Sequence, residues 1–175
     1  LGAELTGVEV DYSQSLGWIE DFDWLNWLAD FELGPIGPFD WESLYIAFNY
    51  AWIDSNVEID TTQTTQTNPD RPLQGQSPWV VNFQIGYNNP DSPNEWTLLY
   101  NEFGERITQA GVQGQPDIYE QPFPLLDFIY KRRFAEDWRF TLKLKNLLDP
   151  EVEYTQGEET TRIFKPGREV VLELQ

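Results

Sequence analysis

Apolar and polar residues alternate along much of this chain, most clearly at residues 78–88. One set of alternate positions is apolar and the other is mostly polar: Trp79, Val81, Phe83, Ile85 and Tyr87 against Val80, Asn82, Gln84, Gly86 and Asn88. Because successive side chains of a strand point to opposite faces, this run predicts a strand with two unlike faces. The pattern returns at residues 138–148, where Phe140, Leu142 and Leu144 alternate with Thr141, Lys143 and Lys145.

The same reading along the whole chain predicts about seven strands and an all-β, antiparallel fold. Their approximate ranges are 5–16, 43–57, 78–88, 95–107, 125–134, 138–148 and 168–174. Several of them approach the roughly 9 to 11 residues that a tilted strand needs to cross a bilayer. The pattern therefore raises the question of whether the apolar face contacts a protein core or lipid.

The connections between these strands alternate in length. Residues 89–94 and 135–137 form short connections, whereas residues 58–77, 108–124 and 149–167 form long polar ones. Outer-membrane barrels show this asymmetry, with short periplasmic turns and longer extracellular loops. The alternation therefore favours a barrel over a soluble sandwich, in which long loops have no strong reason to share one end.

Residues 18–41 depart from this arrangement because they are aromatic and acidic and form a long segment where a short turn is expected. Trp24, Trp27, Leu28 and Phe31 have helical spacing, and residues 34–38 (Gly-Pro-Ile-Gly-Pro) could end a short amphipathic helix. We favour an element at a membrane interface, where Trp is enriched. The segment could instead extend the flanking strands into a hairpin, or pack as a hydrophobic plug under ordinary loops.

Composition narrows the possible functions. The chain has 30 acidic and 11 basic residues and a net charge of −19, which argues against nucleic-acid binding. It contains no Cys and no His, so it lacks thiolates and the commonest general base. No carboxylate pair has a spacing that predicts catalysis or a metal site, so we predict no enzyme activity, metal or cofactor. No run reaches the roughly 18 apolar residues of a membrane-spanning helix, whereas a transmembrane β-barrel is compatible with this composition.

Seven segments, in chain order, resemble motifs of the C-terminal barrel of TonB-dependent outer-membrane receptors. They are TGVEVDY at 6–12, YAWIDS at 50–55, RPLQGQSP at 71–78, LLYNEFGERI at 98–107, PDIYEQP at 116–122, KNLLD at 145–149 and KPGR at 165–168. Each motif alone is weak, but together they extend over nearly the whole chain. One departure is the end of the final strand, where Glu173-Leu174-Gln175 replaces the aromatic ending usual in such barrels.

The resemblance implies that residues 1–175 form a C-terminal segment, about seven strands, of an antiparallel transmembrane β-barrel. It implies energy-dependent uptake of a metal chelate, vitamin or oligosaccharide across the outer membrane of a Gram-negative bacterium. The plug domain and the energy-coupling box of the family have no counterpart in this segment. The implied partners are outer-membrane lipid, the remainder of the barrel with its plug, and the TonB energy-coupling complex.

In such a barrel we expect one face of the strands to contact lipid, at Trp79, Val81, Phe83, Ile85, Tyr87, Phe140, Leu142 and Leu144. Lys131, Arg133, Lys143 and Lys145 are expected to face the lumen. External loop residues Arg71, Asp117, Tyr119 and Arg162 are the candidate ligand contacts. Two alternatives remain: a scaffolding outer-membrane barrel that holds partner proteins without transport, and a soluble acidic β-sandwich that binds sugars through exposed Trp.

Overall fold

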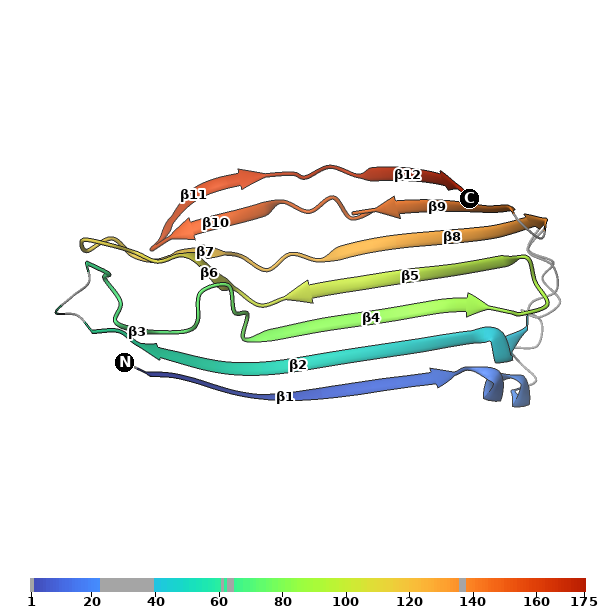
Figure 1. Ribbon diagram of the computed structural model, residues 1–175, viewed down its shortest axis with the longest axis horizontal. Helices are drawn as coiled ribbons and strands as arrows, with labels where there is room; N and C mark the ends of the chain where they lie inside the picture. The colour runs from blue at the N-terminus through green and yellow to red at the C-terminus, as the bar shows by residue number, and fades with distance from the viewer. Residues whose placement is uncertain (1, 23–39, 61, 63–64, 136–137) are drawn as a thin grey trace.

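The computed structural model describes residues 2–22, 40–60, 62, 65–135 and 138–175, and it confirms an all-β, antiparallel fold. The larger sheet has eight strands, seven of them in the order β1-β2-β4-β5-β8-β9-β12. They are β1 (Gly2–Ser15), β2 (Leu44–Glu58), β4 (Trp79–Asn88), β5 (Asn94–Phe103), β8 (Leu125–Ala135), β9 (Trp138–Lys145) and β12 (Glu169–Leu174). The eighth, β3 (Asp70–Arg71), pairs with β2. Along this order each strand pairs with the next strand of the same sheet in the chain, so the seven strands form one long meander (Figure 1).

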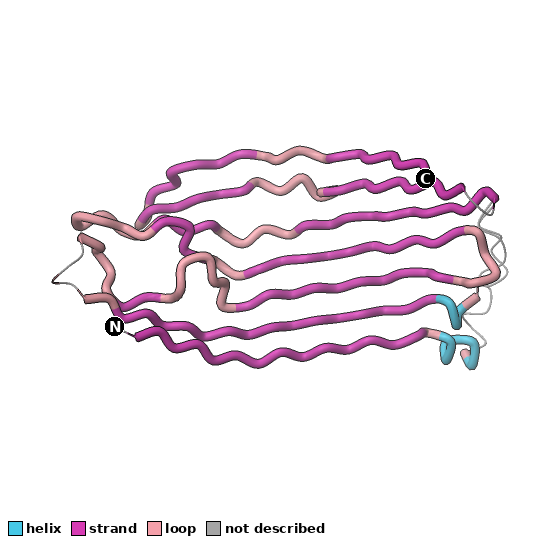
Figure 2. Tube along the Cα trace, viewed as in Figure 1, coloured by secondary structure: helices cyan, strands magenta, loops and turns pink. Residues whose placement is uncertain are grey.

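A second, four-stranded sheet lies at one end of this meander, on the left of Figures 1 and 2. Its order is β11-β10-β7-β6, from β6 (Arg106–Gln109), β7 (Ile118–Glu120), β10 (Val152–Gln156) and β11 (Glu159–Phe164). We call this end the loop end, because the long connections gather there. The opposite turn end carries the short β4–β5 connection and two 3-10 helices, η1 (Gly17–Asp21) and η4 (Trp41–Ser43).

The strand register brings the apolar positions of neighbouring strands into rows on one face, which we call the apolar face. One row consists of Tyr12, Phe48, Phe83, Tyr100 and Leu126. The next consists of Ile46, Ile85, Leu98, Phe128, Leu144 and Val170. The alternate residues form the opposite, polar face, which includes Asp11, Asn49, Asn82 and Asn101 in one row. A two-residue period maintained in register therefore makes the whole sheet two-sided.

Much of the apolar face is exposed. Leu172 is 65% exposed, Val10 52% and Phe83 39%. At the turn end, Trp41, Leu44 and Tyr87 form a small buried cluster. Tyr87 is only 1% exposed and its ring stacks with that of Trp96 at 6.3 Å. Tyr87 therefore shares the apolar face with the other predicted lipid contacts, but η4 covers its side chain.

The large sheet is open. β1 and β12 lie at its two edges, and no strand among the described residues pairs with their outer sides. Within the same residues, no helix is long and apolar enough to cross a membrane.

The predicted strands match the observed ones closely, with two differences. The expected strand at 95–107 is divided into β5 and β6, which belong to different sheets. The connections predicted as long polar loops contain β3, β7, β10 and β11. The helix expected around Trp24, Trp27, Leu28 and Phe31 lies outside the described residues.

Candidate functional site: the loop end and the polar face

Arg71 and Asp117, two of the predicted ligand contacts, meet in a buried ion pair at the loop end. Arg71 Nη1 lies 3.3 Å from Asp117 Oδ1, and the two side chains are 9% and 0% exposed. Asp117 also accepts hydrogen bonds from Asn68 Nδ2 at 2.7 Å and from the Gly111 amide at 2.6 Å. Asp117 is therefore occupied inside the protein and does not present a carboxylate to a ligand.

The Arg71–Asp117 pair joins the two long connections that precede β4 and β8. Backbone hydrogen bonds extend this junction, from the Thr67 amide to the Gly111 carbonyl and from the Gln113 amide to the Thr65 carbonyl. The backbone of Gln115 approaches Gly111 so closely that only glycine fits, because a Cβ atom there would lie 2.1 Å from the Gln115 carbonyl oxygen. The two loops thus form one connected surface rather than independent segments.

Tyr119, the third predicted contact, lies on β7 beside a cavity of about 260 Å³ that it shares with Asp54, Glu105 and Arg106. Burial raises the pKa of its phenol, and the negative charges of Asp117 and Glu105 raise it further. The opposing effect of Arg71 is smaller. Tyr119 therefore remains a neutral hydroxyl at physiological pH and can donate a hydrogen bond into this cavity.

Glu120, the next residue on β7, organises the second sheet. It is 6% exposed and receives Arg106 Nε at 2.7 Å, Arg106 Nη2 at 2.6 Å and the Tyr154 hydroxyl at 2.8 Å. The Arg106 guanidinium also lies 4.2 Å from the centroid of the Phe103 ring. These contacts connect β5, β6, β7 and β10 around one carboxylate.

Arg162, the fourth predicted contact, is exposed on β11 and covers two aromatic rings. Its guanidinium lies 4.2 Å from the Tyr154 ring centroid and 4.9 Å from that of Phe164. It borders a hollow of about 340 Å³ together with Thr108, Gln109 and Thr161. Burial and the hydrogen bond to Glu120 raise the pKa of Tyr154, whereas Arg162 lowers it.

The four predicted contacts therefore do not form a single site. Arg71 and Asp117 hold the loops together, while Tyr119 and Arg162 border separate hollows. Sequence reading missed Arg106, Glu120 and Tyr154, because nothing in a single strand shows which strand will lie beside it.

The polar face of the large sheet carries a ladder of amide side chains that crosses three strands. Asn101 Nδ2 donates to Asn82 Oδ1 at 2.7 Å, and Asn82 Nδ2 donates to Asn49 Oδ1 at 3.0 Å. Asn49 Nδ2 then donates to Glu9 Oε1 at 2.6 Å and Asp11 Oδ1 at 2.7 Å on β1. Hydrogen bonds in such a chain polarise and strengthen one another. The ladder therefore forms an ordered polar surface across β1, β2, β4 and β5.

A groove of about 550 Å³ opens over this ladder, and most of its lining residues belong to the polar face. Beyond the ladder, Tyr45 accepts a hydrogen bond from Gln84 Nε2 at 2.7 Å, and its ring lies over Gly86. A Cβ atom on residue 86 would approach the Tyr45 ring to within 2.6 Å, so glycine leaves the space that this aromatic side chain occupies.

The three lysines predicted to face the lumen lie on this polar face and form ion pairs with glutamates on adjacent strands. Lys143 pairs with Glu173 at 2.6 Å, Lys145 with Glu169 at 3.3 Å, and Lys131 with Glu95 at 3.7 Å. These pairs place charges of both signs side by side on this face. Within the described residues, no group of His, Cys, Asp and Glu has the arrangement of a metal site.

Comparisons of the chain with known protein families, with curated proteins and with solved structures find no match.

Proposed function

We propose that this chain forms the C-terminal part of a TonB-dependent outer-membrane receptor that imports a nutrient such as a metal chelate, vitamin or oligosaccharide. The observation that carries the proposal is the two-sided sheet, in which one face is apolar and in large part exposed and the other face is polar and charged. Water-soluble proteins rarely expose so extensive an apolar surface, whereas a transmembrane barrel requires one. We choose this receptor family because seven segments of the sequence resemble its motifs.

The dimensions of the apolar face agree with a membrane-spanning role. From Trp79 to Tyr87, β4 advances by eight residues, or about 26 Å, close to the apolar band of about 25 Å on outer-membrane barrels. Trp52 pairs with Trp79 near the loop end, and Trp96 pairs with Tyr87 near the turn end. Aromatic residues thus lie at both limits of the apolar face, as the interfacial girdles of such barrels do.

The polar face is suited to a lumen. It carries an amide ladder and lysine–glutamate pairs. Lipid could not hydrate these polar groups, whereas the interior of such a barrel is polar. The connected loops at the opposite end from the short turns are suited to the extracellular side, where Tyr119 and Arg162 border hollows that could admit a ligand. In this arrangement the strands of the remaining barrel pair with the open edges at β1 and β12.

The proposal is tested by two neighbouring substitutions on β4 in the intact protein. Phe83→Arg places a charge on the apolar face, where such a charge in lipid costs roughly 2 to 4 kcal/mol. Gln84→Arg places the same charge on the polar face, beside Tyr45. We expect Phe83→Arg to reduce assembly into lipid vesicles strongly and Gln84→Arg to leave it nearly unchanged, as measured by flotation and protease resistance.

Equal effects of the two substitutions would show that the facing of β4 is wrong. An independent measurement is quenching of Trp fluorescence by brominated lipids, which we expect for the wild-type protein. A protein that stays monodisperse without detergent and shows no quenching would contradict any membrane role. Ligand uptake by cells that express the intact protein then separates a transporter from a scaffolding barrel.

A further inference from the structure

The basic run at residues 131–133 is divided between the two faces of β8. Lys131 pairs with Glu95 on the polar face. Arg133 donates from Nη2 to the carbonyl oxygens of Pro90 at 3.4 Å and Ser92 at 3.1 Å, so it holds the β4–β5 turn. Arg132 extends from the apolar face, where its register partners are Asn94 on β5 and Phe140 on β9. These three basic residues therefore have different roles, and Arg132 is the one directed toward the apolar side.

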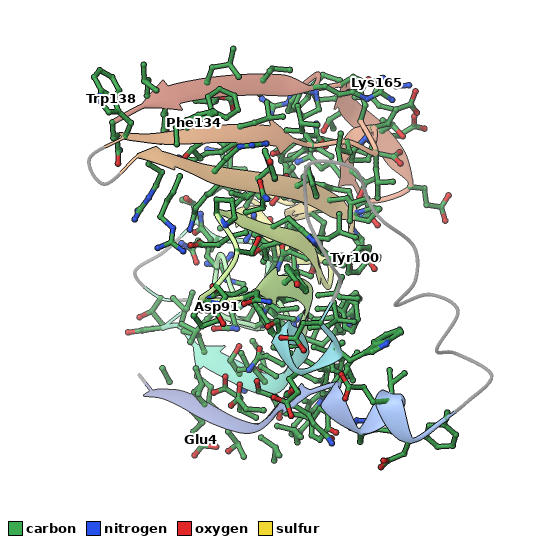
Figure 3. The ribbon with its side chains drawn as sticks, turned by 90° about the vertical axis from the view of Figure 1, so that its right-hand side faces the viewer. Glu4, Asp91, Tyr100, Phe134, Trp138 and Lys165 are labelled. Atoms are coloured by element: carbon green, nitrogen blue, oxygen red, sulfur yellow. The ribbon has the colours of Figure 1, made fainter. Side chains whose placement is uncertain are left out.

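The surroundings of Arg132 are aromatic and aliphatic. Its guanidinium lies 5.5 Å from the ring centroid of Phe134, which in turn contacts Phe140 edge-to-face at 6.4 Å. Phe134 is 60% exposed, and the exposed Leu174 pairs with Phe140 from β12. Phe134 and Trp138 project together at the turn end, at the upper left of Figure 3. Arg132 thus lies within an exposed apolar patch close to the short turns.

The Nε of Arg132 lacks an acceptor among the described residues. Its Nε is shielded from solvent and has no hydrogen-bond partner, and no described carboxylate lies within ion-pair distance of its guanidinium. The nearby Asn94 Oδ1 accepts a hydrogen bond from the Tyr130 hydroxyl. A buried N–H without a partner is costly, and the guanidinium offers further N–H donors beside it, so the site favours an anion supplied from outside.

We propose that Arg132, with Phe134 and Phe140, binds the phosphate headgroup of an anionic phospholipid in the leaflet at the turn end. A planar guanidinium matches a phosphate with two parallel hydrogen bonds, and the exposed Phe134 and Leu174 lie where an acyl chain would pass. The apolar patch selects a lipid over free phosphate, which has no group to bury against those side chains. This inference rests on the proposed membrane function, and it assigns one leaflet and one residue for lipid recognition.

The test uses the intact protein in vesicles of zwitterionic phosphatidylcholine that contain a small fraction of brominated phosphatidylglycerol. A second set of vesicles carries the bromine on phosphatidylcholine instead. We compare the wild type with Arg132→Gln, Arg132→Lys and the matched control Lys165→Gln, which removes one exposed charge away from the turn end. One interfacial Arg near anionic lipid corresponds to an affinity gain of about fivefold. We therefore expect the wild type to prefer phosphatidylglycerol by about this factor, Arg132→Gln to lose the preference, Arg132→Lys to keep part of it and Lys165→Gln to keep all of it.

The other outcomes separate this inference from the proposed function. Quenching by both brominated lipids without preference, or a preference that survives in Arg132→Gln, would overturn the lipid site while leaving the membrane role intact. Absence of quenching by either lipid would instead overturn the membrane role. Loss of the preference on addition of millimolar inorganic phosphate, at constant ionic strength, would show a simple anion site and would also overturn the assignment to lipid.

Discussion

Arg162 and Tyr154 show how one exposed cation tunes a neighbouring phenol at the loop end. Burial and Glu120 raise the pKa of Tyr154, and Arg162 opposes them by stabilising the phenolate. Arg162→Gln is therefore expected to raise the pKa of Tyr154 further and to shift its ionisation to higher pH. Ultraviolet titration measures the shift as a difference between each protein and its Tyr154→Phe derivative, with Lys165→Gln as the charge-matched control. An unchanged pKa of Tyr154 in Arg162→Gln would mean that Arg162 does not contact the phenol in solution.

The raised pKa values of Tyr119 and Tyr154 also set the sign of the pH dependence at the loop end. A phenol whose pKa is higher in the folded protein than in the unfolded chain stabilises the fold while it is neutral. That contribution is complete below the ordinary Tyr pKa near 10 and is lost as pH rises through the raised value. The loop end is therefore expected to weaken in strong alkali, at pH values above the ordinary Tyr pKa.

The roles of individual residues in the site were predicted less well from the sequence than the strands were. Arg71 and Asp117 are 46 positions apart, and both were chosen as ligand contacts because each lies in a polar loop. Their meeting depends on how two loops pack, which no local pattern encodes. Arg132 presents the same difficulty, since alternation assigns its face but does not show that its Nε lacks a hydrogen-bond partner.

At the scale of elements, the seven long strands were predictable because each repeats a two-residue period over enough positions to be recognised. The observed register keeps the apolar positions of neighbouring strands on one face, which is consistent with the alternation of each strand. β3, β7 and β10 were missed because strands of two to five residues are too short to show a period. Their identity comes from long-range pairing, as in the contact of Tyr154 with Glu120.

The junction between the two long loops yields a prediction at this scale. Gly111→Ala would place a methyl group against the backbone of Gln115 and Pro116, which cannot move aside as a flexible side chain can. The turn must shift, and the Gly111 amide then loses its 2.6 Å hydrogen bond to Asp117. We expect faster limited proteolysis within residues 58–77 and 108–124, with the central strands unaffected. Gly2→Ala is the control, because no atom lies within 4 Å of its added Cβ; equal proteolysis of the two variants would argue against a connected loop surface.

For the molecule as a whole, the decisive feature is that the large sheet ends in two open edges, β1 and β12. In an antiparallel ladder, alternate residues of an edge strand direct their N–H groups away from the neighbouring strand. In lipid each such group without a partner costs several kcal/mol, so a membrane-embedded sheet of this kind requires strands beyond both edges. We therefore expect all amides of β1 and β12 in the intact, vesicle-embedded protein to exchange hydrogen slowly, at rates similar to those of β4. If instead every second amide of β1 exchanged at nearly the rate of an unstructured chain, the edge would be open in the assembled protein. The barrel proposal would then fail, even with the apolar face correctly assigned.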